Sequence, residues 1–145
     1  MTRHAEREIV FQMLFEKEFH KDASSQVYAN SLASAGIKET AYIRDTYFGT
    51  VENCEEIDGC ITEFAHKWKL SRMAFVTRTL LRLCVYEMVW GAVPPKAAIN
   101  EAVELAKIYD DDAAPAFING ILNQIARKKG LIKDEAVQSS DGEAQ

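Results

Sequence analysis

Apolar residues recur every three or four positions along most of this chain, the spacing that places side chains on one face of an α-helix. The repeat is strongest between residues 78 and 126, where it predicts three consecutive helices separated by breaks at residues 91–95 and 110–112. Three polar residues, Arg78, Arg82 and Glu87, fall mostly outside the first apolar face. The predicted core positions are Leu80, Leu81, Cys84, Val85, Met88, Val89, Ile99, Ala102, Val103, Ala106, Phe117, Ile118, Ile121, Leu122 and Ile125.

The ends of these three helices are marked by residues with known terminal preferences. Gly91 ends the first helix, and the prolines at 94–95 prevent its continuation while suiting the first turn of the next helix. Asp112 is the predicted N-cap of the third helix, with Pro115 in its first turn. Gly130 is the expected residue just past its end.

One feature of the third helix departs from helical preference. Asn119 and Gly120 form a pair typical of turns, yet they interrupt a strong apolar repeat. Glycine inside a helix costs about 1 kcal/mol relative to alanine, so something should compensate. Two explanations stay open. Close helix–helix contact at Gly120 is favoured by the usual role of such glycines, and an open surface beside Asn119 for a ligand is the alternative.

The N-terminal half predicts further helices over residues 4–19, 24–35 and 41–67, with Gly36 ending the second. Gly49 and Gly59 weaken the third pattern and allow a bend. No strand pattern is present, so the predicted class is all-α, as two small helical bundles that meet along the 41–67 and 75–90 helices. Residues 1–133 are expected to form one domain, with N-terminal helices to about 67 and further helices over about 72–130. The polar stretch 134–145 is predicted to be disordered.

Composition narrows the class of protein. The chain has 145 residues, 48% of them hydrophobic and 27% charged, as in soluble globular domains. Its net charge of −5 argues against a non-specific nucleic-acid coat and leaves room for a small basic site. No segment approaches the ~20 apolar residues of a membrane span, and no signal-peptide pattern is present, so a cytoplasmic location is expected.

The chain lacks the patterns that usually accompany catalysis. It has no glycine-rich phosphate loop, no GxSxG or HExxH motif, and no CxxC pair among its three cysteines. The acids at 110–112 could attract a cation, but helix capping is favoured because a single run offers too few convergent oxygens. We therefore expect no enzyme activity, no metal and no cofactor.

Three segments, LLRLCVYEM, VPPKAAINEAVELAK and FINGILNQIA, resemble the C-terminal signature of the NusB family of transcription antitermination factors in order and spacing. The N-terminal segment TRHAEREIVFQMLFE resembles the opening helix of that family. The resemblance covers most of residues 2–130. It implies an all-α protein that binds RNA and is not an enzyme.

The resemblance also implies partners. Family members pair with a small-subunit ribosomal protein, NusE, and bind a single-stranded boxA element in nascent RNA. The pair helps the transcription elongation complex ignore terminators during ribosomal RNA synthesis. It stays open whether the free protein forms a homodimer. The alternative function is a helical protein–protein adaptor without direct RNA contact.

Three cations, Arg3, His4 and Arg7, gather within an arc of about 100° at the start of the first helix, taking 3.6 residues per turn. Composition alone favours surface charges that pair with neighbouring acids. The resemblance favours RNA contact, because relatives touch RNA with this helix. Both arginines lie off the apolar stripe, so we expect them to be exposed and replaceable without loss of the fold.

Three more residues are candidates for RNA contact. Lys96 lies at a helix start, where free backbone amides add to its positive charge. Phe117 and Asn119 match the family segment around FINGILNQIA. The resemblance places Phe117 near the RNA, whereas its helical spacing supports a place in the core equally well.

The protein partner is expected to bind the helices between about residues 72 and 112. Thr77 stands where many relatives carry an acid, and residues 113–115 replace a more polar stretch of the family. Arg82 is expected to be a buried partner of Glu101 or Glu104 rather than a ligand contact.

Overall fold

The computed structural model describes residues 1–20, 23–65 and 69–132, and within these ranges all regular secondary structure is helical. The elements are α1 (Arg3–Lys17), α2 (Ser24–Ala35), α3 (Ala41–Glu52), α4 (Cys54–Phe64), the 3-10 helix η1 (Leu70–Arg72), α5 (Phe75–Val89), α6 (Pro95–Tyr109) and α7 (Ala114–Lys128). The predicted all-α class is confirmed. The predicted disordered tail, 134–145, lies outside the described residues. None of the described helices is long and apolar enough to cross a membrane.

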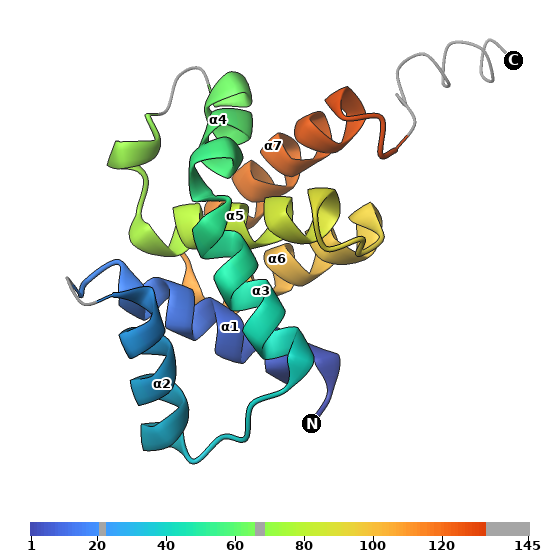
Figure 1. Ribbon diagram of the computed structural model, residues 1–145. Coiled ribbons are helices and arrows are strands. Elements are labelled where there is room, and N and C mark those ends of the chain that lie inside the picture. The colour runs from blue at the N-terminus through green and yellow to red at the C-terminus, as the bar shows by residue number, and fades with distance from the viewer. Residues whose placement is uncertain (21–22, 66–68, 133–145) are drawn as a thin grey trace, which may run out of the picture.

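Helix α5 occupies the centre of the molecule and packs against α1, α3, α4, α6 and α7 (Figure 1). The N-terminal helices α1, α2 and α3 form one group, and α4, α5, α6 and α7 form the other. The groups meet along α3, α4 and α5, as the predicted pair of bundles requires. Helix α5 therefore links the two groups.

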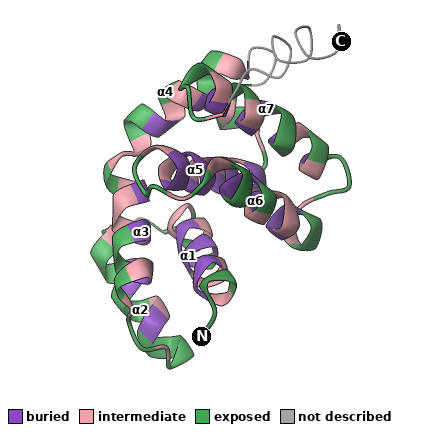
Figure 2. Ribbon diagram, turned by 90° about the vertical axis from the view of Figure 1, so that its right-hand side faces the viewer, coloured by how far each residue is buried: buried purple, intermediate pink, exposed green. Residues whose placement is uncertain are grey.

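The apolar faces predicted for α5, α6 and α7 form the core. Leu80, Leu81 and Val85 of α5 are fully buried, as are Ile118 and Ile125 of α7. They belong to one continuous hydrophobic cluster that also includes residues of α1, α3 and α4. Figure 2 shows the buried positions on the inward faces of α1, α5 and α6. The two bundles thus share a single core.

The prediction of one helix over 41–67 is wrong, because the chain breaks at Asn53 into α3 and α4. The Asn53 backbone has φ −101° and ψ 13°, and its side-chain Nδ2 donates to the carbonyl of Gly49 at 2.8 Å. An asparagine side chain can replace a backbone donor in this way, which favours a helix end. Residues 66 and 67, the predicted end of this helix, lie outside the described residues.

Gly36, Gly130 and Pro115 stand at helix ends as predicted, whereas Asp112 does not have its predicted role. Gly36 and Gly130 adopt φ of 66° and 72°, the left-handed conformation expected after a helix, and Pro115 lies in the first turn of α7. Asp112 does not cap α7. Oδ1 of Asp111 instead accepts from the backbone N–H groups of Ala113 and Ala114 at 3.1 and 3.0 Å. The N-cap position of α7 is Ala113, which has no capping side chain, so Asp111 serves the turn that leads into the helix.

Candidate nucleic-acid interface

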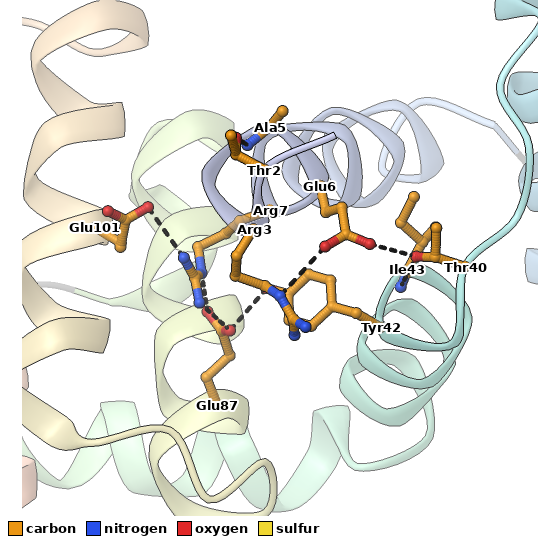
Figure 3. A network of polar contacts seen from close by, with 10 residues as sticks. All are labelled: Thr2, Arg3, Ala5, Glu6, Arg7, Thr40, Tyr42, Ile43, Glu87 and Glu101. Atoms are coloured by element: carbon orange, nitrogen blue, oxygen red, sulfur yellow. Dashed lines mark hydrogen bonds and ion pairs between the residues drawn. The ribbon is translucent and has the colours of Figure 1, made fainter.

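The first turns of α1 place its cations beside three other helices. Thr2 caps α1, because its Oγ1 accepts from the backbone N–H of Ala5 at 3.0 Å. The helix therefore begins at Arg3, and its N-terminal end lies against α3, α5 and α6 (Figure 3). Arg3, His4 and Arg7 are brought together there, as the sequence predicts, but their surroundings differ.

Arg7 is buried, with only 6% of its surface exposed. Its Nε and Nη2 bind the two carboxylate oxygens of Glu87 on α5 at 2.8 and 2.9 Å, and its Nη1 binds Glu101 of α6 at 3.0 Å. The prediction that Arg7 is exposed is wrong, so the expectation that it can be replaced without loss of the fold loses its basis. A position off the apolar stripe is buried here because α1 crosses α5 and α6 at this point.

Glu87 is 1% exposed and also accepts a hydrogen bond from the Tyr42 hydroxyl at 2.7 Å. Burial, followed by the charge and hydrogen bond of Glu87, raises the pKa of Tyr42. Burial lowers the pKa of Arg7, but the hydrogen bond and charge of Glu87 outweigh it, so the net shift is upward. Arg7 therefore stays charged, and Tyr42 stays a hydrogen-bond donor.

Arg3 completes this group from the surface side. Its guanidinium lies 4.1 Å from the centre of the Tyr42 ring, and its Nε is 3.2 Å from Oε1 of Glu6. Glu6 in turn accepts from the Thr40 hydroxyl at 2.6 Å. The Arg3 side chain is 60% exposed, so one face of its guanidinium is open to solvent. We call Arg3, Arg7, Tyr42, Glu87 and Glu101 the Arg7 cluster.

His4 lies on the rim of the Arg7 cluster. Its Nδ1 is 2.8 Å from Oε1 of Glu101, and about half of the side chain is exposed. The hydrogen bond and charge of Glu101 raise the pKa of His4. Burial raises the pKa of Glu101, but the hydrogen bonds from His4 and Arg7 outweigh it and lower the pKa overall. The Glu101 carboxylate is therefore already paired with two of the predicted RNA contacts, His4 and Arg7.

Lys96 is exposed in the first turn of α6. It lies five residues before Glu101, about 7.5 Å along the helix axis at 1.5 Å per residue. Five residues also turn Lys96 about 140° around the helix axis from Glu101, so the two side chains leave α6 on different faces.

Phe117 and Asn119 belong to α7, which packs mainly on α4, α5 and α6. Phe117 is half-buried and borders a groove of about 390 Å³, the Phe117 groove. Asn119 is exposed, and its Oδ1 accepts from Nδ2 of Asn123 at 3.2 Å. The Phe117 groove is lined by Arg72, Met73, Ala74, Thr77, Asp111, Ala113, Ala114 and Phe117.

Gly120 does not make the close helix contact that its position favours. It is exposed, and a Cβ added to it would meet no described atom within 4 Å. Since no other helix among the described residues packs against Gly120, the packing explanation is wrong. The surface beside Asn119 is open, which leaves the ligand explanation in place.

Arg82 forms ion pairs inside the fold, as predicted, but its partners are not the predicted ones. It binds Asp58 of α4 through Nε at 2.8 Å and through Nη2 at 3.1 Å, and its Nη1 lies 3.2 Å from Glu18. Its face of α5 is turned toward α4 and the end of α1, whereas Glu101 and Glu104 lie on α6. The sequence pattern places Arg82 off the core without showing which neighbouring helix faces it.

Two residues of the site are missed by the sequence argument. Glu87 falls mostly outside the apolar face of α5, and Tyr42 is one aromatic residue in a helical repeat. The sequence feature that could have revealed Glu87 is a single acid between the strongly apolar positions 83–85 and 88–89. A buried carboxylate needs a cation nearby, so this acid predicts a cation on a neighbouring element. Periodicity alone does not reveal that the cation comes from α1.

Comparison with known proteins gives consistent results. A model of the NusB family matches residues 4–127. The transcription antitermination protein NusB of Acetivibrio thermocellus is 41% identical over 137 residues, covering 92% of this chain and 94% of the relative. The structure of T. maritima NusB superposes with a TM-score of 0.81 at 34% identity, covering 88% of this chain and 92% of that one.

A third similar chain belongs to a crystal structure of the antitermination factors NusB and NusE in complex with dsRNA. The matching chain has a TM-score of 0.78 and 25% identity, covering 88% of this chain and 99% of that one. The fold described above therefore occurs in a complex that holds both a protein and RNA.

Proposed function

The chain belongs to the NusB family, and we propose that it is a transcription antitermination factor that binds a boxA-like single-stranded RNA jointly with the ribosomal protein NusE. It would act in the cytoplasm, within the transcription elongation complex, during ribosomal RNA synthesis. The related NusB–NusE–dsRNA complex supports both the RNA and the protein partner. Members of this family are antitermination factors and not enzymes.

The observation that carries the RNA assignment is the presentation of Arg3. Its guanidinium is stacked on Tyr42 and open on its other side, and Arg7 and Glu87 fix the helix that bears it. A guanidinium held in this way can bind a phosphate or stack on a base with little loss of side-chain freedom. His4 provides further positive charge on the same helix, Lys96 is the proposed contact from α6, and Arg7 contributes by positioning α1.

The RNA site on this chain is weak by itself. Glu6, Glu87 and Glu101 already pair with the three cations at the start of α1. A phosphate must therefore compete with carboxylates for His4, and Arg7 is not accessible. Tight binding requires additional contacts from a second protein, since two linked weak sites bind more strongly than either alone.

The Phe117 groove is the proposed contact for the protein partner. Its lining combines the apolar residues Met73, Ala113 and Ala114 with the charged residues Arg72 and Asp111. Thr77 donates its hydroxyl hydrogen to Asp110, so the wall of the groove is polar but uncharged at this position. Five of its eight lining residues fall between 72 and 112, the range expected for the partner face, and the other three belong to the start of α7 and the residue before it. Asn119 lies two residues beyond Phe117, beside the open surface at Gly120, and is a proposed RNA contact.

The test is a titration of boxA-like RNA with and without NusE. The proposal predicts much tighter binding in the presence of NusE, and a loss of about fivefold (~1 kcal/mol) in Arg3→Ala. The slope of log affinity against log salt should flatten by about 0.7, the value for one phosphate contact in a single strand. Lys69→Ala removes an exposed cation near η1 and serves as the matched control.

Two outcomes would contradict the proposal. Equal RNA affinity with and without NusE would rule out the shared site. Equal affinity of Arg3→Ala, Lys69→Ala and the natural chain would support the adaptor alternative, in which NusE binds but RNA does not touch α1.

A further inference from the structure

A second groove lies between the C-terminal half of α3 and the end of α5. It measures about 500 Å³, within the usual size of a ligand site, and is called here the Trp90 groove. Its role is inferred from five of the residues that line it, and none of these belongs to the Arg7 cluster or lines the Phe117 groove. They are Arg44, Asp45, Glu52, Tyr86 and Trp90.

The aromatic wall of the Trp90 groove depends on Gly49. A Cβ at this position would lie 2.4 Å from atoms of the Tyr86 ring, so only glycine lets that ring lie across α3. The Tyr86 hydroxyl donates to the backbone carbonyl of Asp45 at 3.4 Å, which fixes the ring further. The Trp90 ring is nearly parallel to it, with an interplanar angle of 7° and centroids 6.3 Å apart. Trp90 remains 36% exposed, which leaves an indole surface available to a ligand.

The charges around the Trp90 groove are predominantly negative. Arg44 lies 3.2 Å from Asp45 and 3.7 Å from Glu39, so one guanidinium already faces two carboxylates. Glu52 adds a third carboxylate at the end of α3, on an exposed position. The excess of negative charge repels phosphate and attracts a cation.

We propose that the Trp90 groove binds an arginine- or lysine-bearing segment of a protein partner, with the cation against Trp90 and with Asp45 and Glu52 as counter-charges. Tryptophan is the aromatic side chain that attracts cations most strongly through its face. Carboxylates on the same wall add charge complementarity and orient the ligand. The inference does not rest on the proposed RNA function, because it uses none of the same residues.

The test uses the blocked peptide Gly-Arg-Gly-Arg-Gly and its citrulline counterpart, which has the same shape without the charge. The readout is the indole Nε1–H resonance of Trp90 in the full chain, assigned by its loss in Trp90→Phe. The arginine peptide should shift this resonance to saturation, and the citrulline peptide should not. Glu52→Gln should weaken binding about threefold, as expected for an exposed charge pair.

Glu63→Gln is the matched control, because it removes an exposed acid of α4 that does not line the groove. It should leave the affinity unchanged. Equal weakening by Glu52→Gln and Glu63→Gln would show attraction to overall acidity and overturn the proposal. So would equal shifts by the two peptides. A shift caused by single-stranded RNA but not by the arginine peptide would assign the groove to RNA instead.

Discussion

The Arg7 cluster and the α7 surface around Phe117, Asn119 and Gly120 are both predicted RNA contacts, yet they are built in opposite ways. In the Arg7 cluster a buried guanidinium and a buried carboxylate satisfy each other, and four helices meet around them. The α7 surface is open beside Gly120 and borders an apolar groove. Apart from the exposed guanidinium of Arg3, the first region is closed by its own contacts, whereas the second leaves surface for another molecule.

This difference separates residues that position α1 from residues that can contact RNA. Charges that are paired inside the fold hold α1 in place, so their removal affects stability before it affects RNA. An exposed residue on an open surface can be changed with little effect on stability, so a loss of binding there reports contact. The predictions below test first the closed region and then the open one.

The largest effect is expected for Glu87→Gln. The substitution keeps the side-chain shape but leaves Arg7 with only Glu101 as a charged partner. Removing one partner of a buried ion pair costs about 3–5 kcal/mol, so the free energy of unfolding should fall by roughly 3 kcal/mol. Denaturant unfolding followed by circular dichroism measures this.

The control for that experiment is Glu104→Gln, which breaks an exposed pair with Lys107 on α6. It should change the free energy of unfolding by less than about 0.5 kcal/mol. A double-mutant cycle with Arg7→Met should show that the two losses are not additive. If Glu87→Gln were no more destabilising than Glu104→Gln, the Arg7 cluster would not hold α1.

A smaller loss is expected for Gly49→Ala at the contact between α3 and α5. The new methyl group would overlap the Tyr86 ring, whose atoms lie 2.4 Å from the Cβ position. Overpacking usually costs about 1–3 kcal/mol, and the higher helix propensity of alanine offsets about 1 kcal/mol of it. Thermal unfolding should therefore show net destabilisation. The steric cause is confirmed if Gly49→Ala no longer destabilises the protein in a Tyr86→Ala background, and refuted if it costs as much there as in the natural chain.

Gly49 and Gly120 show what the sequence can and cannot predict. Each is a glycine inside a helical repeat, but one lies against a ring from another helix and the other faces open space. The repeat predicts α5, α6 and α7 because it depends on residues within each helix. The burial of Arg7, its pairing with Glu87 and the partners of Arg82 depend on which helices cross, and no local pattern contains that information. The resemblance predicts the family and leaves the roles of single residues undetermined.

Gly120→Ala is expected to act in the opposite direction from Gly49→Ala. With no described atom near the new methyl group, the gain in helix propensity should raise the free energy of unfolding by up to about 1 kcal/mol. RNA affinity in the presence of NusE is measured on the same protein. A more stable variant that binds RNA less well would show that the ligand approaches this surface. Unchanged RNA affinity would remove Asn119 and its surroundings from the proposed site.

The smallest effect is expected at the rim of the Arg7 cluster, where His4 meets Glu101 at 2.8 Å. The hydrogen bond and charge of Glu101 raise the pKa of His4 above its ordinary value of 6.5. Because the folded-state pKa is raised, this contact stabilises the fold fully below the unfolded-state pKa and is lost as pH rises through the folded-state pKa. RNA affinity should likewise increase as pH falls through the pKa of His4, since the protonated ring attracts phosphate. Glu101→Gln should return that pKa toward 6.5 in an NMR titration of the imidazole, and His4→Gln should abolish the part of the pH dependence due to this residue. An unchanged pKa in Glu101→Gln would show that His4 and Glu101 are not paired in solution, and the competition between Glu101 and RNA would then be excluded.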